Sequence, residues 1–306
     1  MASLRAHLFD LVVRFSVKRR LGHAPDIARI REVFDQNRLK PSPSAVFDPG
    51  QLGGIPGEWV RPRKRPETAR PRLLYLHGGG FVGGSPLTHR TITAAFARAN
   101  FCVFAPEYRL APEHPFPAAL DDVAAAWTAF SQGGPAVVAG DSAGGNLALA
   151  LVVEARRRGL TPPAAVALFS PACDFLSRGA SFRTNIRRDA MFRPDCLANL
   201  VPAYLGDADP LDPRISPVEA DFAGFPPLLL HAAERELMRD DCVALAETAR
   251  AAGVRVELAL WPVVPHAWQL ADNYVPEARR SIEAAAAFLH RELAGATAEA
   301  AREPVP

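Results

Sequence analysis

The stretch Ala136-Val-Val-Ala-Gly-Asp-Ser-Ala-Gly-Gly-Asn146 carries a short apolar segment directly into a glycine-rich corner that holds one serine, Ser142. Residues Gly140-Asp-Ser-Ala-Gly144 have the form G-x-S-x-G. In a strand-to-helix turn this pattern sets the serine on a sharp bend, where side chains at the two glycine positions would collide with neighbouring elements. Small residues match the pattern often by chance, so its meaning depends on the segments around it.

Short apolar segments alternate with helix-length segments from residue 72 onward. This alternation is expected when parallel strands are buried on both faces by crossover helices. The expected strands are 73–76, 101–105, 136–139, 165–169, 228–232 and 256–260, and the expected helices are about 89–99, 118–131, 145–157, 240–252 and 276–294. The sequence therefore predicts an α/β fold with a doubly wound, mostly parallel sheet. Ser142 would lie at the carboxyl edge of that sheet, where ligands bind in such folds.

Two regions interrupt the alternation: residues 1–45, and residues 175–215, which are rich in Arg, Pro and Asp. Neither has the pattern of a parallel strand, so we expect them to form a small helical cap over one end of the sheet. Two surface excursions without a role in binding are the alternative. On the cap interpretation, residues 46–174 and 216–306 form the α/β catalytic domain.

Residues His77-Gly-Gly-Gly-Phe81 directly follow the expected strand 73–76. They place backbone without side chains at the carboxyl edge of the sheet. The amides of Gly79 and Gly80, together with that of Ala143, could there stabilise a developing oxyanion. A phosphate-binding loop is the rival interpretation, but the lysine and hydroxyl of G-x-x-x-x-G-K-[ST] and the order G-x-G-x-x-G are both absent. We therefore expect no nucleotide cofactor.

A nucleophilic serine needs a general base and an orienting acid, and chains with this motif carry them in the order serine, acid, histidine. Of the eight histidines, His266 follows the last expected strand and precedes the last helix, so it reaches the carboxyl edge. His231 lies inside a strand, where a core role is expected, and His290 lies in the C-terminal helix. His266 is therefore the expected base.

The acid is expected on the loop after the fifth expected strand, in Glu234-Arg-Glu-Leu-Met-Arg-Asp-Asp241. Asp240 or Asp241 fits the N-cap of the following helix, which leaves Glu234 and Glu236. Glu236 lies deeper in the loop and is favoured for that reason. Spacing alone does not separate the two.

The composition excludes other classes of function. At 306 residues and 49% apolar, the chain can bury a large core. Its net charge of +2 gives no general attraction to nucleic acid, and the one dense basic run, Arg61-Pro-Arg-Lys-Arg65, is expected to be a solvated loop. The cysteines show no C-x-x-C spacing, so we expect free thiols, no metal site and a cytoplasmic protein. They are Cys102, Cys173, Cys196 and Cys242.

The N-terminal segment carries apolar residues at helical spacing, which predict an amphipathic helix. They are Leu4, Leu8, Leu11 and Phe15. Asp10 and Arg14 interrupt any signal-peptide core. We expect the apolar face to cover another part of the same chain, with a position on a membrane surface as the alternative. No stretch of about 18 uninterrupted apolar residues occurs, so no stable membrane insertion is expected.

Six groups of residues between Gly57 and Leu293 are highly specific in combination. They are Tyr75-Leu-His-Gly-Gly-Gly-Phe81, Tyr108-Arg-Leu-Ala-Pro-Glu-His-Pro-Phe-Pro-Ala-Ala-Leu-Asp-Asp122, Gly140-Asp-Ser-Ala-Gly-Gly145, Ser170-Pro171 with Asp174, Asp212-Pro213 with Ser216-Pro217, and Pro265-His266. Through these residues the chain resembles the hormone-sensitive-lipase-like, or bacterial family IV, carboxylesterases of the α/β-hydrolase fold.

The resemblance implies a cofactor-free carboxylesterase with a helical cap made from the N-terminus and an insertion after the sixth strand. It also implies an oxyanion hole formed by Gly79, Gly80 and Ala143. The family commonly has Asp as its acid, in a D-x-L-x-D-E setting. The aligned residue here is Glu236, and some branches look similar in using Glu. Arg109 is expected to have a structural role, satisfying buried carbonyls or a carboxylate.

These observations lead to the hypothesis of a serine carboxylesterase for short- to medium-chain acyl esters, in which Ser142 attacks, His266 is the base and Glu236 orients the imidazole. An acyltransferase or amidase is one alternative. A non-catalytic binding protein is the other, similar to plant hormone receptors on this scaffold, which have lost the histidine. The expected partner is a small-molecule ester, and an exposed last strand would suit a homodimer. Trp268 is expected either to line the alcohol side or to pack in the core.

Overall fold

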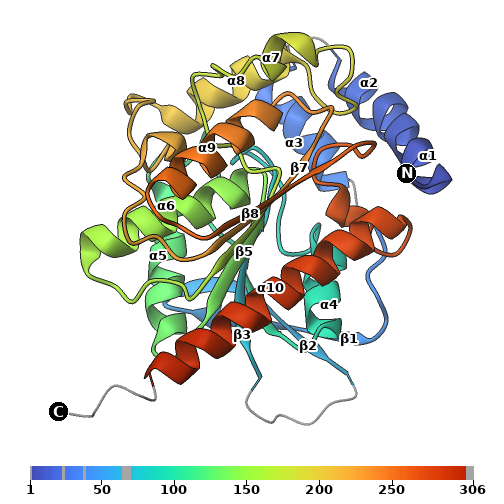
Figure 1. The fold of residues 1–306 in the computed structure, drawn as a ribbon. Coiled ribbons are helices and arrows are strands. Elements are labelled where there is room, and N and C mark those ends of the chain that lie inside the picture. Colours follow the sequence, from blue (N-terminus) through green and yellow to red (C-terminus); the bar gives the residue numbers. More distant parts are fainter. Residues whose placement is uncertain (1, 23–24, 37–38, 64–69, 301–306) are drawn as a thin grey trace.

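The computed structural model describes residues 2–22, 25–36, 39–63 and 70–300 (Figure 1). Eight strands form one sheet. In chain order they are β1 (Ala45–Leu52), β2 (Ile55–Pro62), β3 (Arg72–Leu76), β4 (Cys102–Pro106), β5 (Val137–Asp141), β6 (Val166–Phe169), β7 (Leu228–Ala233) and β8 (Val256–Trp261). They lie side by side in the order β1-β2-β4-β3-β5-β6-β7-β8, and all pairs are parallel except β1 with β2 and β2 with β4. The predicted α/β fold with a mostly parallel sheet is thus confirmed.

All six strands expected from the apolar segments are present, and no end differs from its expected position by more than two residues. The five expected helices are present too. They are α4 (Arg90–Arg98), α5 (Ala118–Ser131), α6 (Ala143–Arg158), α9 (Arg239–Ala251) and α10 (Pro276–Ala300). These segments are predictable because each is buried along most of its length, so apolar periodicity alone reveals it.

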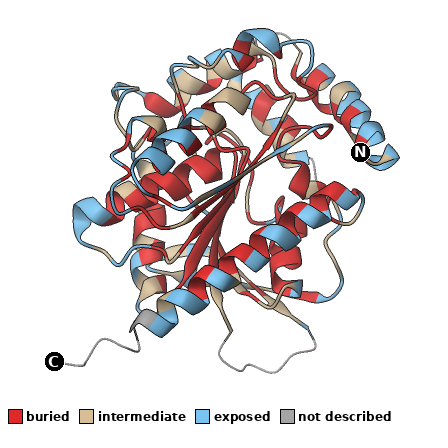
Figure 2. Cartoon of the chain, viewed as in Figure 1, coloured by how far each residue is buried: buried red, intermediate tan, exposed pale blue. Residues whose placement is uncertain are grey.

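The helices cover both faces of the sheet. Alternate residues of β3 show this, since Leu74 packs in the core beneath α5, α6 and α9, whereas Leu73 and Tyr75 pack in the core beneath α4 and α10. The burial pattern in Figure 2 shows the central strands covered on both sides. The carboxyl ends of β3, β5, β7 and β8 consequently meet at one edge.

An antiparallel hairpin of β1 and β2, which the apolar pattern does not reveal, extends the sheet. Gly53 and Gly54 take positive φ angles of 58° and 81° at its two-residue turn, as the favoured hairpin turns require. Pro49 and Pro56 interrupt the alternation of the two strands. Pro49 lies on the edge strand β1, where proline is tolerated. Pro56 lies before the stretch of β2 that pairs with β4, which begins at Gly57.

The solvated loop expected at 61–65 is wrong for the first two residues of the run, whereas Arg63 is exposed in a turn. Arg61 and Pro62 lie in β2, and Arg61 Nη2 lies 2.5 Å from Asp48 Oδ2 of the neighbouring β1. Strand pairing therefore sets the conformation of these two residues. Positions 64 and 65 lie outside the described residues.

The two irregular regions lie together across one end of the sheet (Figure 1). The N-terminal region forms α1 (Leu4–Val13), the π-helix η1 (Arg14–Lys18), α2 (Arg19–Leu21) and α3 (Ile27–Gln36), and the second region contains α7 (Ser181–Thr184) and α8 (Pro194–Leu205). Arg14 donates to the carbonyls of Arg187 and Arg188 at 3.0 and 2.8 Å. The rings of Phe34 and Phe192 meet edge to face. The two regions thus pack on each other.

Helix α1 faces the opposite way from our expectation. The apolar residues at helical spacing point to solvent, with exposed fractions of 85% for Leu4, 61% for Leu8, 48% for Leu11 and 65% for Phe15. Polar anchors at both ends explain this orientation: Ser3 donates from its amide and hydroxyl to Glu277, both at 2.8 Å, and Lys18 Nζ donates to the carbonyl of Asp189 at 2.6 Å. The prediction that this face covers another part of the chain is therefore wrong.

The four cysteines, all among the described residues, form no disulfide, which agrees with the expectation from their spacing. Within the ranges given above, no helix is both long enough and apolar enough to cross a bilayer.

Candidate active site

Ser142 occupies the bend between β5 and α6. Its backbone has φ 53° and ψ −119°, a region that residues with a side chain rarely adopt. Two hydrogen bonds hold the bend, from Ser142 N to the carbonyl of Phe169 at 2.8 Å and from Asn146 N to the carbonyl of Ser142 at 3.0 Å. The glycines fit tightly, because a Cβ at Gly144 would overlap the backbone carbonyl of Leu76 at the end of β3. The serine is thereby fixed at the carboxyl edge of the sheet.

The structure brings His266 and Glu236 into direct contact. His266 Nδ1 lies 2.8 Å from Glu236 Oε2, and the other carboxylate oxygen, Oε1, accepts from the amide of Ala233 at 2.9 Å. Both side chains are buried. Glu234, the alternative acid, is not the residue on the imidazole, and its own amide donates to the carbonyl of Trp261.

The electrostatic surroundings of His266 favour its protonated form. Burial alone would lower the pKa of the imidazole, but the hydrogen bond and charge of Glu236, with smaller contributions from Asp189 and Asp141, raise the pKa above its usual value. The carboxylate also selects the tautomer, because Nδ1 must carry the proton that Glu236 accepts. In the neutral ring, the lone pair of Nε2 is then available to accept a proton.

His266 Nε2 is buried and has no hydrogen-bond partner among the described residues. A buried polar atom without a partner is uncommon and calls for an explanation. Here the atom belongs to a ring that lines the same cavity as Ser142. A base and a nucleophile that share one cavity can join through a hydrogen bond that tightens when a substrate binds.

The three amides expected to form an oxyanion hole border Ser142. Gly80 and Ala143 line one cavity with Ser142, and Gly79 and Gly80 line the other. Gly79 and Gly80 have φ angles of 131° and 61°, which a residue with a Cβ would adopt only with strain. Within the described part of the chain, no hydrogen bond takes its donor from these three amides. The N–H groups are therefore available to a ligand.

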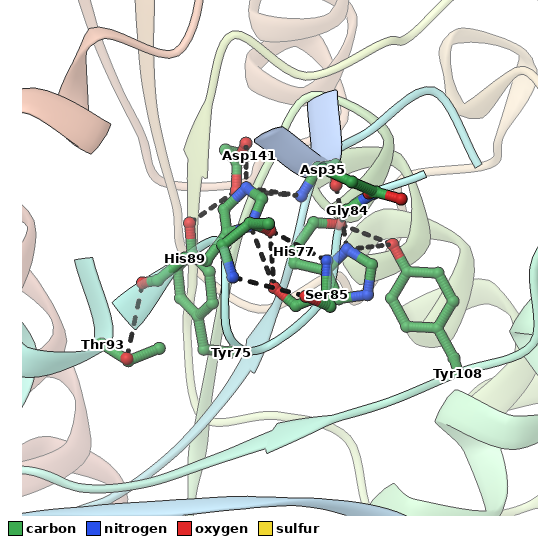
Figure 3. Close-up of polar contacts among 11 residues, drawn as sticks. Asp35, Tyr75, His77, Gly84, Ser85, His89, Thr93, Tyr108 and Asp141 are labelled. Carbon is green, nitrogen blue, oxygen red and sulfur yellow. Dashed lines mark hydrogen bonds and ion pairs between the residues drawn. The ribbon is translucent and has the colours of Figure 1, made fainter. Parts of the chain in front are cut away.

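A buried polar network that the sequence analysis does not anticipate supports the glycine loop (Figure 3). Asp141, directly before the serine, accepts from the hydroxyl of Tyr75 at 2.6 Å and from the amide of Gly78 at 3.1 Å, and its other oxygen lies 3.3 Å from His89 Nε2. Burial opposes ionisation of Asp141, but the charge and hydrogen bond of His89, with those of its other partners, lower its pKa below the usual value. The acidic residue inside G-x-S-x-G is the one sequence signal that could have revealed this network.

His77, the first residue of the glycine loop, is held as a neutral ring. Burial and the charge of His89 lower its pKa to about 3. Its Nδ1 donates to the carbonyl of Gly78 at 2.9 Å, and the hydroxyl of Tyr108 donates to the carbonyl of His77 at 2.5 Å (Figure 3). The histidine that opens the loop thus fixes its path and does not face the serine as a base.

Residues of the two cap regions hold the loop of Glu236 and the glycine loop by hydrogen bonds from outside the sheet. Asp189 Oδ2 accepts from the amide of Leu237 at 2.8 Å, and Asn185 Nδ2 donates to the carbonyl of Glu236 at 2.9 Å. On the other side, Asp35 Oδ1 accepts from the amide of Gly84 at 2.9 Å (Figure 3). No local pattern predicts these positioning residues, since about 50 residues separate each from its partner.

Two small cavities meet at Ser142, each with a volume of about 60 Å³. The first is almost wholly apolar and includes Phe182, Leu197 and Leu200 from the second cap region. The second is lined by His266 and by Val17 from the N-terminal region. A larger hollow of about 620 Å³ lies at the amino ends of β3 and β4. It contains none of the candidate residues.

Other residues singled out in the sequence have structural positions. His231 donates to or accepts from Ser281 Oγ at 2.8 Å inside the core, and burial lowers its pKa to about 4. Arg109 binds the carboxylate of Asp122 through two nitrogens, as expected. Trp268 is fully buried and packs against Trp261, so it belongs to the core and not to the cavity wall.

The expected N-cap of α9 is wrong. The helix begins at Arg239 with Met238 as its N-cap, and Asp240 and Asp241 lie in the first turn, where carboxylates favour the helix dipole. Asp240 Oδ2 accepts from the amide of Ser181 in α7. Asp240 therefore binds a residue of α7 and does not cap α9.

Comparisons with known proteins agree with this geometry. A model of the α/β hydrolase fold family matches residues 73–270. The chain is 38% identical over 266 residues to an acetyl-hydrolase of Streptomyces hygroscopicus, covering 85% of this chain and 86% of the relative. It is 33% identical over 267 residues to an esterase of Acinetobacter venetianus, covering 85% and 87%. Among solved structures it is similar to EstE5, with a TM-score of 0.90 at 33% identity over 96% of this chain and all of that one. It is also similar to a hormone-sensitive lipase from a metagenome library, with a TM-score of 0.88 at 32% identity over 96% and 100%.

Gly144→Ala should destabilise the fold, because the new Cβ would meet backbone carbonyls at the end of β3, which cannot swing aside as a side chain would. We expect a loss of about 1–3 kcal/mol in the free energy of unfolding, measured by urea denaturation. Gly295→Ala is the matched control, since its Cβ would enter open space on helix α10 and should be neutral or stabilising by up to about 1 kcal/mol. Equal losses in both variants would contradict the steric account of the bend.

Proposed function

The chain belongs to the α/β-hydrolase fold family, among the bacterial esterases related to hormone-sensitive lipase, and is a carboxylic ester hydrolase; from this premise we propose that it cleaves short- to medium-chain acyl esters through a triad of Ser142, His266 and Glu236. The observation that carries the proposal is the buried hydrogen bond between Glu236 and His266, which leaves Nε2 unpaired in the cavity that contains Ser142. Such a base, oriented by a carboxylate and open toward a serine, is the arrangement that activates a hydroxyl.

In the first half-reaction the Ser142 oxygen attacks the ester carbonyl while His266 Nε2 takes the hydroxyl proton. Negative charge then develops on the carbonyl oxygen, and the amides of Gly79, Gly80 and Ala143 receive it. The tetrahedral intermediate collapses as Nε2 returns the proton to the leaving alcohol oxygen. This leaves an acyl group on Ser142 and a neutral imidazole.

In the second half-reaction a water molecule takes the place of the alcohol. His266 accepts a proton from the water as its oxygen attacks the acyl carbonyl, and the same amides stabilise the second oxyanion. Collapse breaks the bond to the Ser142 oxygen, which regains its proton from Nε2. Glu236 stays ionised throughout and stabilises the imidazolium that forms twice in the cycle.

The two cavities suggest how the ester is placed. His266 must reach the leaving alcohol oxygen, so the cavity that it lines takes the alcohol portion and the apolar cavity beside Leu197 and Leu200 takes the acyl chain. Both volumes, about 60 Å³, are far below the roughly 300–1,000 Å³ of sites for drug-sized ligands. Short acyl chains fit this size, and the two cap regions form the lid that limits it.

Ser142→Ala should reduce kcat by roughly 10⁶-fold, as loss of the nucleophile does in other triads. The measurement is hydrolysis of nitrophenyl butyrate. Labelling by a fluorophosphonate tests the same serine independently, because only an activated serine reacts. Labelled wild type and unlabelled Ser142→Ala support an enzyme, whereas an unlabelled wild type would favour the binding-protein alternative.

The pH profile should report the raised pKa of His266. Only the neutral imidazole accepts the serine proton, so kcat/KM should fall as the pH drops through a midpoint above about 6.5. In Glu236→Gln the charge that raises the pKa is lost while burial continues to lower it, so the midpoint should move to lower pH as the maximal rate falls. Glu234→Gln is the control and should leave the midpoint in place. A shift in the Glu234 variant instead would reassign the acid.

The acyl cavity should set the chain-length preference. We expect wild-type kcat/KM on nitrophenyl esters to be highest at about two to six acyl carbons and at least about tenfold lower for decanoate. Leu197→Ala should move the optimum to longer chains, because it widens the apolar cavity at a half-buried position. Rates that keep rising on long, emulsified chains would replace the esterase proposal with a lipase. Product analysis with an added alcohol or amine would reveal acyl transfer.

A further inference from the structure

The N-terminal helices carry an exposed apolar stripe that the enzyme's chemistry does not use. We define the stripe by five side chains, all at least 48% exposed. They are Leu4, Leu8, Leu11, Val12 and Phe15. They lie along α1 and the start of η1, and Figure 2 shows this outward face of α1 as exposed. Contiguous apolar surface of this kind on a soluble fold usually marks an interaction site.

The helix that bears the stripe is fixed in place. Ser3 binds Glu277 at its beginning, and Arg14 and Lys18 bind carbonyls between residues 186 and 189 at its end. Its inward face also packs, since Val13 and Val17 are buried. The stripe is therefore presented by a rigid element, so its exposure does not reflect a loosely attached terminus.

The exposed charged side chains between residues 4 and 21 are all arginines. Exposed arginines border it on the helices themselves, at Arg5 and Arg19, and on the adjacent segment, at Arg187 and Arg188. The only acidic residue between positions 2 and 22 is Asp10, which is 5% exposed and points inward. An apolar stripe with a cationic border is the pattern of helices that lie in the interface of anionic bilayers.

We propose that the apolar stripe and its arginines bind the surface of a lipid bilayer that contains anionic headgroups. The apolar side chains enter the boundary between headgroups and acyl chains, and the guanidinium groups pair with lipid phosphates and carboxylates. A second copy of the chain fits the surface less well, because a two-fold contact through the stripe would bring the arginines of the two copies together. Charge complementarity therefore selects the membrane.

Binding of this kind would place the cap against the lipid. Val17, on the inward side of the same helical segment, lines the cavity that contains Ser142 and His266. Apolar esters dissolved in the bilayer would then reach the site without crossing water. The binding itself is independent of the catalytic proposal, since no triad residue takes part in it.

The test is co-sedimentation of the full chain with vesicles, using both the wild type and Ser142→Ala. We expect both to sediment with vesicles of phosphatidylcholine and phosphatidylserine, to bind pure phosphatidylcholine more weakly, and to dissociate as salt is added. Failure of Ser142→Ala to hydrolyse esters while it still binds vesicles would separate the two proposals.

Variants of the stripe give the decisive comparison. A triple variant with Leu8→Ser, Leu11→Ser and Phe15→Ser should bind vesicles about tenfold or more weakly. A double variant with Arg5→Gln and Arg19→Gln should bind more weakly by roughly fivefold per arginine, on anionic vesicles only. Leu211→Ser is the matched control, since Leu211 and Leu11 are both 48% exposed, and should bind as the wild type does. Retained hydrolysis of nitrophenyl acetate shows that each variant is folded.

Three results would overturn the proposal. They are absence of the wild type from the anionic vesicle pellet, equal binding by the triple serine variant, and light scattering that shows a wild-type dimer which becomes a monomer in that variant. The last result would assign the stripe to a second copy of the chain.

Discussion

A buried carboxylate must be surrounded by hydrogen-bond donors, and in this chain the buried Asp189 of the second cap region meets that requirement partly with the amide of Leu237, next to Glu236. Glu236 satisfies its two oxygens with His266 and the amide of Ala233, but its loop is held by Asn185 and Asp189 from the second cap region. Loss of either partner of the buried Glu236–His266 pair would cost about 3–5 kcal/mol in the free energy of unfolding, because the other charge would be left without compensation. The position of His266 thus depends on a segment that also lines the apolar cavity beside Ser142. The same segment both covers the cavity and supports the loop of Glu236. Substitutions that reshape the cavity should therefore also shift His266.

Asp141 is the counterpart of Glu236 on the other side of the serine. Its oxygens accept from Tyr75 and the amide of Gly78, and lie near His89, so it ties the glycine loop to β5. The two carboxylates have different tasks because their surroundings differ: one faces an imidazole whose second nitrogen is open, whereas the other is enclosed by partners that donate to it. Glu236 and Asp141 thus help to hold His266 and the glycine loop beside Ser142.

The sequence was sufficient for the parts of the site that depend on the parallel sheet. Ser142 and His266 could be placed at one edge because strands that are buried on both faces are recognisable locally, and their carboxyl ends must meet. The sequence favours Glu236 over Glu234 but does not separate them by spacing, since the five-residue loop between β7 and α9 has no periodic pattern. Contacts such as that of Asp189 with Leu237 could not be predicted, because they join segments that are distant in sequence and come together only through the packing of the cap.

Helix α1 shows why an amphipathic pattern does not predict what a helix contacts. The spacing of its apolar residues correctly predicts a helix. The side that packs is chosen by free energy summed over the whole helix, including polar groups that periodicity ignores. Ser3 on Glu277 and Lys18 on the carbonyl of Asp189 fix the two ends. With those anchors made, the face carrying Val17 must turn inward and the face carrying Phe15 must turn out. The apolar side chains on the outer face remain in water. Burying them against a further partner would therefore lower the free energy.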